Sequence, residues 1–318
     1  MRSLITGIGG FAGSHLVDLL LSRGEEVEGT IKDPGDTGLI AHLIDRKQIE
    51  VHPLDIRDRK GMTDLLQDGR FDRIYHLAGI TFIPESVESP RETLDVNLGG
   101  TLTLFEAARL GAPQARILYV SSAAAYGDLD DPSAPVVEET PLRPNNPYGF
   151  TKAAGDLMAY QYASQHGLEV VCARPFNHTG PRQSPLFVCS EFAKAVAEME
   201  AGKRPAELNV GNLEVGRDFT DVRDTVRGYL LLLEKGRAGE AYNLASGRAT
   251  RIRDILDTLV RMSRTDVRIS QDPQKMRRGE VLSIIGSSGK AAKETTWSPA
   301  IPFEQTLRDL LEWWRTRI

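Results

Sequence analysis

Tyr148 and Lys152 stand four residues apart in NNPYGFTKAAGDLMAY, a segment that predicts the start of a helix. At helical spacing the two side chains share one face and lie roughly 6 Å apart along the axis. A free tyrosine has a pKa of about 10 and is a poor acid at neutral pH, whereas a nearby ammonium lowers that pKa. Pro147 suits a first helical turn, which would place Tyr148 at the positive end of the helix. The pair is a candidate for proton transfer, although the same spacing is common on amphipathic helices that do no chemistry.

A glycine-rich segment, LITGIGGFAGSHLVDLLLSRG, places Gly7, Gly10 and Gly13 between a predicted strand and a predicted helix. Glycines at such a point allow a tight turn and let the backbone approach a pyrophosphate at the helix N-terminus. Three spaced glycines alone are a weak signal, but the strand before them and the helix after them are the context of a dinucleotide site. We therefore predict a nucleotide cofactor at this loop, rather than a turn with no ligand.

The end of the second predicted strand, EVEGTI, should lie beside the adenosine ribose of that cofactor. A carboxylate there is typical of NAD sites, and a cation is typical of NADP sites. Lys32 and Asp33 are neighbours at this place. Lys32 favours NADP(H), while NAD(H) stays possible because a solvated lysine in a turn would give the same pattern. Asp55, after the third strand, is a candidate for contact with adenine or simply a turn-capping aspartate.

The elements that must position these side chains alternate regularly over residues 2–175. Short aliphatic runs such as RIYHLAG and RILYVSS are separated by amphipathic stretches such as TLTLFEAARLG. The alternation predicts an α/β fold, a Rossmann-type doubly wound parallel sheet with helices on both faces. After residue 177 the alternation weakens, and helices are predicted at 189–202, 222–236, 251–263 and 303–316. We expect an NAD(P)-binding Rossmann domain at 1–176, with segments around 218–245 returning to it, and a smaller C-terminal substrate-binding lobe formed mainly by 177–318.

Composition narrows the class of protein. The chain has 318 residues, of which 41% are hydrophobic and 26% charged, as in an ordinary globular protein. A net charge of −5 without runs of like charge argues against a nucleic-acid partner. The longest aliphatic runs are too short to span a bilayer, and two cysteines, Cys172 and Cys189, are too few for a disulfide framework. The chain starts directly in a strand pattern, so we expect a cytoplasmic protein without a signal peptide or membrane partner, and no metal site is predicted.

The motifs TGIGGFAG, HLAG, VNLGGT, YVSSAAAYG, PYGFTK and ARPFN together resemble, nearly end to end, the extended short-chain dehydrogenase/reductases that act on nucleotide sugars. The resemblance implies three catalytic residues, Ser122, Tyr148 and Lys152. It implies that the cofactor is bound by Gly7, Gly10, Phe11, Gly13, Lys32, Asp55, Ile56, Leu77, Ala78, Gly79, Tyr148 and Lys152. It also implies a homodimer formed through helices near 97–110 and 148–165. His178 is expected to be a loop residue without a chemical role.

Beyond residue 176 the segments FNHTGPRQSPLFVCSEFAKAV, VGNLEVGRDFTDVRD and MRRGEVLSIIGSS are similar to the branch of the family that acts on GDP-mannose. The matching motifs imply that Ser122 and Asn177 meet the sugar and its phosphate. They imply that GDP is contacted by Lys194, Arg217 and Arg277, with Glu280 accepting from the ribose hydroxyls. Guanidinium groups suit a diphosphate because they form bidentate, charge-assisted hydrogen bonds, although either arginine alone is equally compatible with a solvated surface.

The expected reaction depends on Ala124. Dehydratases of this branch carry a glutamate two residues after the Ser or Thr, which serves the elimination across C5 and C6; here that position is Ala124, flanked by two more alanines. A methyl group cannot move a proton, whereas Ser122, Tyr148 and Lys152 suffice for hydride transfer and one protonation. The resemblance therefore implies NAD(P)H-dependent reduction of GDP-4-keto-6-deoxy-D-mannose to GDP-D-rhamnose. A 4,6-dehydratase with a displaced acid and a nucleotide-sugar 4-epimerase are the alternatives.

Overall fold

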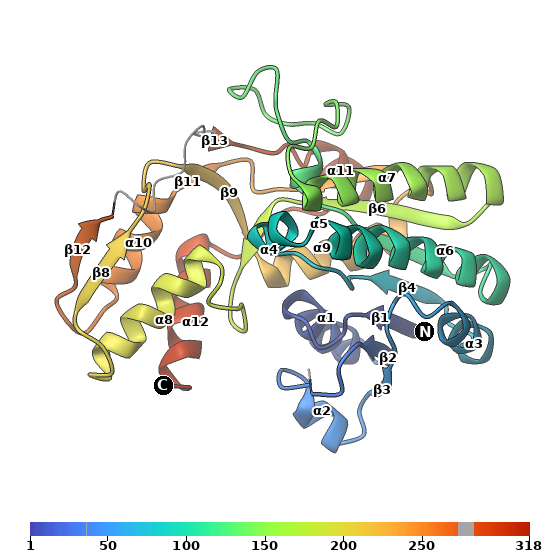
Figure 1. The fold of residues 1–318 in the computed structure, drawn as a ribbon, viewed down its shortest axis with the longest axis horizontal. Helices are drawn as coiled ribbons and strands as arrows, with labels where there is room; N and C mark the ends of the chain where they lie inside the picture. Colours follow the sequence, from blue (N-terminus) through green and yellow to red (C-terminus); the bar gives the residue numbers. More distant parts are fainter. Residues whose placement is uncertain (36, 273–282) are drawn as a thin grey trace.

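The computed structural model describes residues 1–35, 37–272 and 283–318, and a seven-stranded parallel sheet forms its centre (Figure 1). The strand order is β10-β6-β5-β4-β1-β2-β3. Every neighbouring pair in this sheet is parallel. The order reverses between β1 and β4, and ligands of open α/β sheets bind at such a switch point. The strands are β1 (Arg2–Thr6), β2 (Glu26–Ile31), β3 (Glu50–Pro53), β4 (Arg73–His76), β5 (Arg116–Val120), β6 (Glu169–Pro175) and β10 (Ala241–Leu244).

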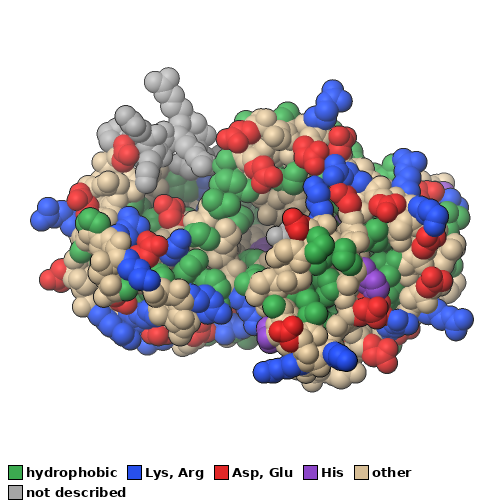
Figure 2. All heavy atoms as spheres, turned by 60° about the horizontal axis from the view of Figure 1, so that its bottom comes forward, with side chains coloured by type: hydrophobic (Ala, Val, Ile, Leu, Met, Phe, Trp, Pro, Cys, Tyr) green, Lys and Arg blue, Asp and Glu red, His purple; other side chains and the backbone are tan. Residues whose placement is uncertain are grey.

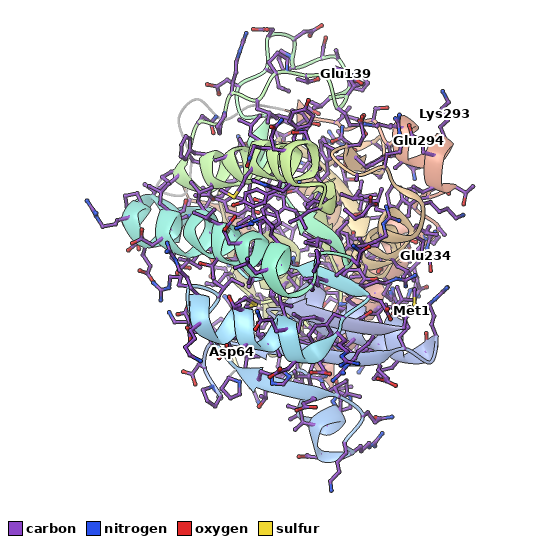
Figure 3. All side chains as sticks on the ribbon, turned by 90° about the vertical axis from the view of Figure 1, so that its right-hand side faces the viewer. Met1, Asp64, Glu139, Glu234, Lys293 and Glu294 are labelled. Atoms are coloured by element: carbon purple, nitrogen blue, oxygen red, sulfur yellow. The ribbon has the colours of Figure 1, made fainter. Side chains whose placement is uncertain are left out.

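Helices cover both faces of this sheet, which explains why its inner strands are nearly continuous apolar runs. One face packs α1 (Phe11–Ser22) and α9 (Val222–Lys235) into a buried cluster with Ile5 and Leu118. The other face packs α3 (Arg59–Gly69), α6 (Gly100–Gly111) and α7 (Pro147–His166) around Ile74 and Ile117. In Figure 3, Asp64 of α3 and Glu234 of α9 accordingly lie on opposite sides of the sheet.

Short elements connect and border the sheet. They are α2 (Ala41–Asp45), α4 (Ile83–Glu88), α5 (Pro90–Leu94), the π-helix η1 (Asp95–Gly99), the 3₁₀ turn η2 (Ala123–Ala125) and α11 (Gly289–Thr295). Asn97 in η1 is buried, accepts from the Ile80 amide at 2.7 Å and donates to the Ile80 carbonyl at 2.9 Å. The π-helix therefore fixes the backbone that leaves β4 at the switch point.

The remaining elements form a second mass beside the carboxyl ends of the strands (Figure 1). Its core joins α8 (Val188–Glu200), α10 (Ile252–Arg261) and α12 (Phe303–Arg315) through residues such as Phe192, Leu256 and Leu310. Two small sheets complete it: β8 (Glu207–Val210) with β12 (Arg268–Gln271), and β9 (Gly216–Asp221) with β7 (Asn177–Thr179), β11 (Ala249–Arg251) and β13 (Ser283–Ile284).

The predicted α/β Rossmann-type fold class is confirmed. The four helices predicted after residue 177 lie within two residues of their predicted bounds, because each has one clearly apolar face. The short helices α2, α4, α5, η1 and α11 were not predicted, since they are too short to show a helical period. The boundary between the two predicted parts stays a prediction, although β10 does join the main sheet. Within the described residues, no helix combines the length and apolar character needed to cross a membrane.

Candidate active site

A cavity of about 1440 Å³ lies between the carboxyl ends of the strands and the second mass. Figure 2 shows the surface hollowed between these two parts, with hydrophobic side chains along the border. Its volume exceeds the roughly 300–1,000 Å³ typical of a site for one small ligand. Its wall includes every predicted cofactor-binding residue, the three predicted catalytic residues, Asn177 and Arg217. The cavity is therefore large enough for two ligands that meet near Tyr148.

The cofactor end of the cavity is shaped by the glycine-rich loop. Gly7 follows β1 with φ +73°, a left-handed conformation that side chains rarely adopt,. A Cβ at Gly7 would lie 3.0 Å from backbone atoms of Ala78, so the glycine also allows the loops after β1 and β4 to touch. The amide of Gly10 donates to the Gly7 carbonyl at 3.0 Å and α1 then begins at Phe11. This arrangement leaves a helix N-terminus at the cavity wall, which suits a pyrophosphate.

Charged groups gather where the adenosine end of a dinucleotide would lie. Lys32 is exposed and its ammonium is 4.0 Å from carboxylate oxygens of both Asp55 and Glu92. Arg57 donates to both oxygens of Asp55, from Nη2 at 2.7 Å and from Nε at 3.0 Å. The hydrogen bond from Arg57 lowers the pKa of Asp55 to about 2. Asp55 therefore stays ionised and holds Arg57, while Lys32 remains available at the cavity wall.

Ser122, Tyr148 and Lys152 converge at the middle of the cavity. Ser122 follows β5 by two residues and caps the η2 turn, where its hydroxyl accepts from the Ala124 amide at 3.1 Å. Asn146 caps α7 by accepting from the Gly149 amide at 2.8 Å, which fixes Tyr148 in the first turn. The Tyr148 phenol is hydrogen-bonded to the Ser122 side chain. The cap of the η2 turn and the first turn of α7 thus bring the hydroxyl groups of Ser122 and Tyr148 together.

Lys152 is buried, one turn after Tyr148, and its ammonium donates to the Val120 carbonyl at 2.7 Å. It lies 5.4 Å from the ring centre of Tyr119 and 5.9 Å from that of Tyr148. Burial lowers the pKa of Lys152 to about 8. The lysine is therefore charged at neutral pH but loses its proton more readily than a lysine in water.

The expected lowering of the Tyr148 pKa by Lys152 is not what the structure gives. Burial raises the pKa of Tyr148, and the hydrogen bond from Ser122 offsets only part of this effect. Desolvation of the buried phenol dominates, and the Lys152 ammonium donates to the Val120 carbonyl rather than to the phenol oxygen. At neutral pH Tyr148 is a protonated phenol, which can act as an acid.

The predicted substrate residues are only partly brought together. Asn177 and Arg217 line the cavity, on the adjacent strands β7 and β9. Lys194 does not line it: its ammonium lies 3.6 Å from a carboxylate oxygen of Glu198 and 5.4 Å above the ring of Trp314. The phase of α8 turns this side chain toward α12, so the geometry gives no support to its predicted contact with GDP. Arg277 and Glu280 lie outside the described residues.

Several cavity residues were not found from the sequence. His178 belongs to β7 rather than to a loop, and its ring stacks on Phe11 with centres 5.9 Å apart. Phe82 and Phe187 approach edge to face from the two sides of the cavity, with centres 5.9 Å apart. Glu191, in the first turn of α8, also lines the wall. Spacing along the helix gave no signal for Glu191, because Lys194 follows three residues later and yet does not line the cavity.

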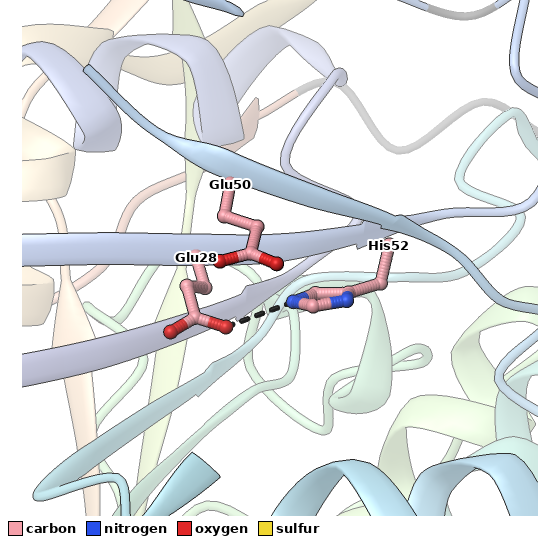
Figure 4. Close-up of side chains that lie close together, drawn as sticks. All are labelled: Glu28, Glu50 and His52. Carbon is pink, nitrogen blue, oxygen red and sulfur yellow. Dashed lines mark hydrogen bonds and ion pairs between the residues drawn. The ribbon is translucent and has the colours of Figure 1, made fainter. Parts of the chain in front are cut away.

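A separate cluster lies on β2 and β3. One possible ligand atom from each of Glu28, Glu50 and His52 lies within 4.8 Å of the others (Figure 4). Glu28 accepts from the His52 Nε2 at 2.8 Å and from the Arg2 guanidinium on its other oxygen. Both oxygens of Glu28 are thus already engaged, and the predicted absence of a metal stays a prediction.

Comparison with known proteins places the chain in a family. The family model described as GDP-mannose 4,6 dehydratase matches residues 4–310. GDP-6-deoxy-D-mannose reductase from Pseudomonas aeruginosa is 35% identical over 317 residues, which cover 100% of this chain and 98% of that protein. The solved structure of RMD from Pseudomonas aeruginosa complexed with NADPH has a TM-score of 0.87 and 34% identity, over 100% of this chain and 99% of that one. The UDP-glucose 4-epimerase of Thermus thermophilus, solved in complex with NAD, has a TM-score of 0.87 and 27% identity, over 100% of both chains. The glycine loop after β1 and the Tyr148–Lys152 pair at the start of α7 line one cavity, and with these matches over its full length this chain belongs to the GDP-mannose 4,6-dehydratase family.

Proposed function

We propose that this protein reduces the 4-keto group of GDP-4-keto-6-deoxy-D-mannose to give GDP-D-rhamnose, with NADPH preferred and NADH possible. Support comes from the 35% identity to a GDP-6-deoxy-D-mannose reductase over the full chain. The cavity adds support, because it has room for a dinucleotide and a nucleotide sugar on either side of Tyr148. The net chemistry is the transfer of one hydride and one proton to the carbonyl.

The residues at the cofactor end fit a nicotinamide dinucleotide. A Cβ at Gly13 would lie 2.6 Å from the Gly7 carbonyl oxygen, so the loop can be this compact only with glycine, and α1 begins directly behind it. Lys32 lines this end of the cavity directly after β2 and would meet a 2′-phosphate, which supports NADP(H),. When bound, the cofactor supplies the hydride. Gly7, Gly10 and Gly13 would hold its pyrophosphate and Lys152 its nicotinamide ribose.

The side chains at the centre of the cavity would handle the proton. Tyr148, kept protonated by burial, donates its proton to the oxygen that forms at C4 as the carbonyl is reduced. Ser122 hydrogen-bonds the same oxygen and orients the phenol. Lys152, charged at neutral pH, stabilises the tyrosinate left after proton transfer,. No further acid or base is required.

The observation that carries the proposal is the η2 turn. Its three alanines follow Ser122 directly, and Ala124 holds the place where a dehydratase of this family carries its glutamate. An elimination would therefore need a carboxylate from elsewhere. Glu85, on α4, lines the cavity, and the hydroxyl of the neighbouring Ser86 accepts from the Tyr148 amide at 3.3 Å. Glu85 is therefore the acid that we would test first in a displaced-acid dehydratase.

Incubation with GDP-4-keto-6-deoxy-D-mannose and either NADPH or NADH tests the proposal. We expect one cofactor oxidised per sugar, a higher kcat/KM with NADPH, and GDP-D-rhamnose rather than its C4 epimer as the product by NMR. With GDP-mannose and NADP⁺ we expect no 4-keto product. Robust formation of that product, abolished by Glu85→Gln, would replace the reductase with a dehydratase. Conversion of a nucleotide sugar into its C4 epimer without net use of cofactor would instead identify an epimerase.

We further propose a homodimer. Large apolar side chains lie exposed on the outer face of α6 and α7, namely Leu110, Phe150, Leu157 and Tyr160. Several exposed large apolar side chains on two packed helices are typical of a protein–protein interface, and a second copy would pair these helices about a two-fold axis. Light scattering should give twice the chain mass, and Leu157→Lys should shift it to the monomer. A cytoplasmic location is proposed on the two free, buried cysteines,.

A further inference from the structure

Glu191 places a carboxylate on the wall of the substrate side of the cavity. It lies in the first turn of α8 and is exposed, and the same wall includes Asn209 and Asn212 from the end of β8 and the loop after it. Phe192 and Val210, which also line the cavity, belong to the buried apolar cluster behind this wall. A carboxylate backed by apolar groups forms stronger hydrogen bonds than one surrounded by water.

The Glu191 side chain forms no hydrogen bond or ion pair with any residue that the structure describes. Its natural helical partner would be Lys194, three residues later, but that ammonium is paired with Glu198. An ionised carboxylate only accepts hydrogen bonds, through two oxygens that lie side by side. Glu191 therefore presents two unused acceptors to whatever occupies this part of the cavity.

The charge of Glu191 restricts which part of a nucleotide sugar it can meet. Under the proposed function the diphosphate of the ligand lies beside Arg217. Phosphates placed next to Glu191 would be repelled by its carboxylate. Glu191 thus suits a neutral part of the ligand that carries hydrogen-bond donors, at a distance from the phosphates. In a nucleoside diphosphate sugar whose sugar lies at Tyr148, the part farthest beyond the phosphates is the base.

Among the common bases, guanine has two adjacent donors, N1–H and the 2-amino group, at a spacing that matches the two oxygens of a carboxylate. Adenine and cytosine place an acceptor beside their amino group, and uracil has acceptors on both sides of its N–H. We propose that Glu191 determines the specificity of this site for guanine by accepting from N1–H and the 2-amino group. This inference rests on the proposed function for the position of the phosphates.

Calorimetric titration of the full chain with GDP, IDP, 2′-deoxy-GDP and ADP tests the contact. IDP lacks only the 2-amino group of GDP. We expect GDP to bind roughly 10- to 100-fold more tightly than IDP, the range for one hydrogen bond to a charged group, and ADP to bind more weakly still. Glu191→Ala and the isosteric Glu191→Gln should weaken GDP binding and bring GDP and IDP within about threefold of each other.

Glu198→Gln is the matched control, because Glu198 is on the same helix but faces Lys194 and Arg204 instead of the cavity. It should keep the preference for GDP. In turnover, Glu191→Ala should raise the KM for the GDP-sugar with little change in kcat, since the base is remote from the reacting carbon.

The outcomes separate this inference from the proposed function. Equal affinity of the wild type for GDP and IDP, or a preference for GDP that survives Glu191→Ala, overturns the role of Glu191 even if the keto-sugar is reduced. Loss of affinity for 2′-deoxy-GDP but not for IDP would assign Glu191 to the ribose and also overturns it. A Glu191-dependent preference for GDP in a protein that does not reduce the keto-sugar would support the guanine contact and reject the reductase.

Discussion

Replacing Lys152 with methionine should stabilise the protein at neutral pH while it removes activity. Lys152 is 5% exposed, and burial lowers its pKa from 10.5 to about 8. At about 1.4 kcal/mol for each tenfold change in proton affinity, holding this charge in the fold costs about 3 kcal/mol at pH 7. The hydrogen bond to the Val120 carbonyl returns about 1 kcal/mol. We expect Lys152→Met to raise the free energy of unfolding by about 2 kcal/mol.

The difference in unfolding free energy between Lys152→Met and the wild type should change with pH in a direction that can be measured. Between pH 8 and 10.5 the unfolded chain still binds the proton that the folded Lys152 has released, so the wild type gains stability as the pH rises. By pH 10 the native lysine is neutral and the advantage of the methionine is lost. At that pH the variant should be less stable than the wild type by about 1 kcal/mol, the value of the lost hydrogen bond.

Urea unfolding of the protein without ligands, at pH 7 and pH 10, measures both values, and an activity assay measures the loss of turnover. Lys293→Met is the control, since Lys293 is exposed on α11 and points away from the body of the protein (Figure 3). It should change stability by less than about 0.5 kcal/mol at either pH. A Lys152→Met variant that is less stable than the wild type at pH 7, or whose difference does not change with pH, would refute this account of the buried charge.

Three further substitutions test the site. Tyr148→Phe should lower kcat at least about a hundredfold, the usual span for loss of a general acid. The control, Tyr160→Phe on the outer face of the same helix, should leave kcat unchanged. A Tyr148→Phe enzyme of near-normal rate would remove the phenol from the mechanism. Arg217→Ala should raise the KM for the nucleotide sugar about tenfold or more with a smaller change in kcat, and an unchanged KM would mean that the diphosphate lies elsewhere. Gly149→Ala should lower both stability and kcat, because its Cβ would lie 2.5 Å from the Ala124 carbonyl oxygen. Such overpacking costs about 1–3 kcal/mol of stability. A thermal melting temperature equal to that of the wild type would contradict the contact.

The sequence alone was enough to predict the features of the fold and of the site that depend on the conformation of a few adjacent residues. The glycine loop requires a turn between a strand and a helix whatever surrounds it, so its role in shaping the cavity wall could be predicted from Gly7, Gly10 and Gly13. The four-residue spacing of Tyr148 and Lys152 fixes their common face as soon as the segment is helical. The parallel sheet follows from alternating apolar runs and amphipathic helices, because such runs must be covered on both faces.

The tertiary structure decided which side chains face the cavity and how readily they ionise. Lys194 and Glu191 lie on one helix, and only the packing of α8 against α12 determines that the lysine turns to Trp314 while the glutamate faces the cavity. The pKa of Tyr148 is likewise raised by burial under segments distant in sequence, and the hydrogen bond from Ser122 offsets only part of this effect. Orientation and desolvation are sums over many long-range contacts, whereas spacing along a helix or strand is a property of a few adjacent residues. A single sequence therefore determines the local geometry of this site, and only the assembled fold determines its chemistry.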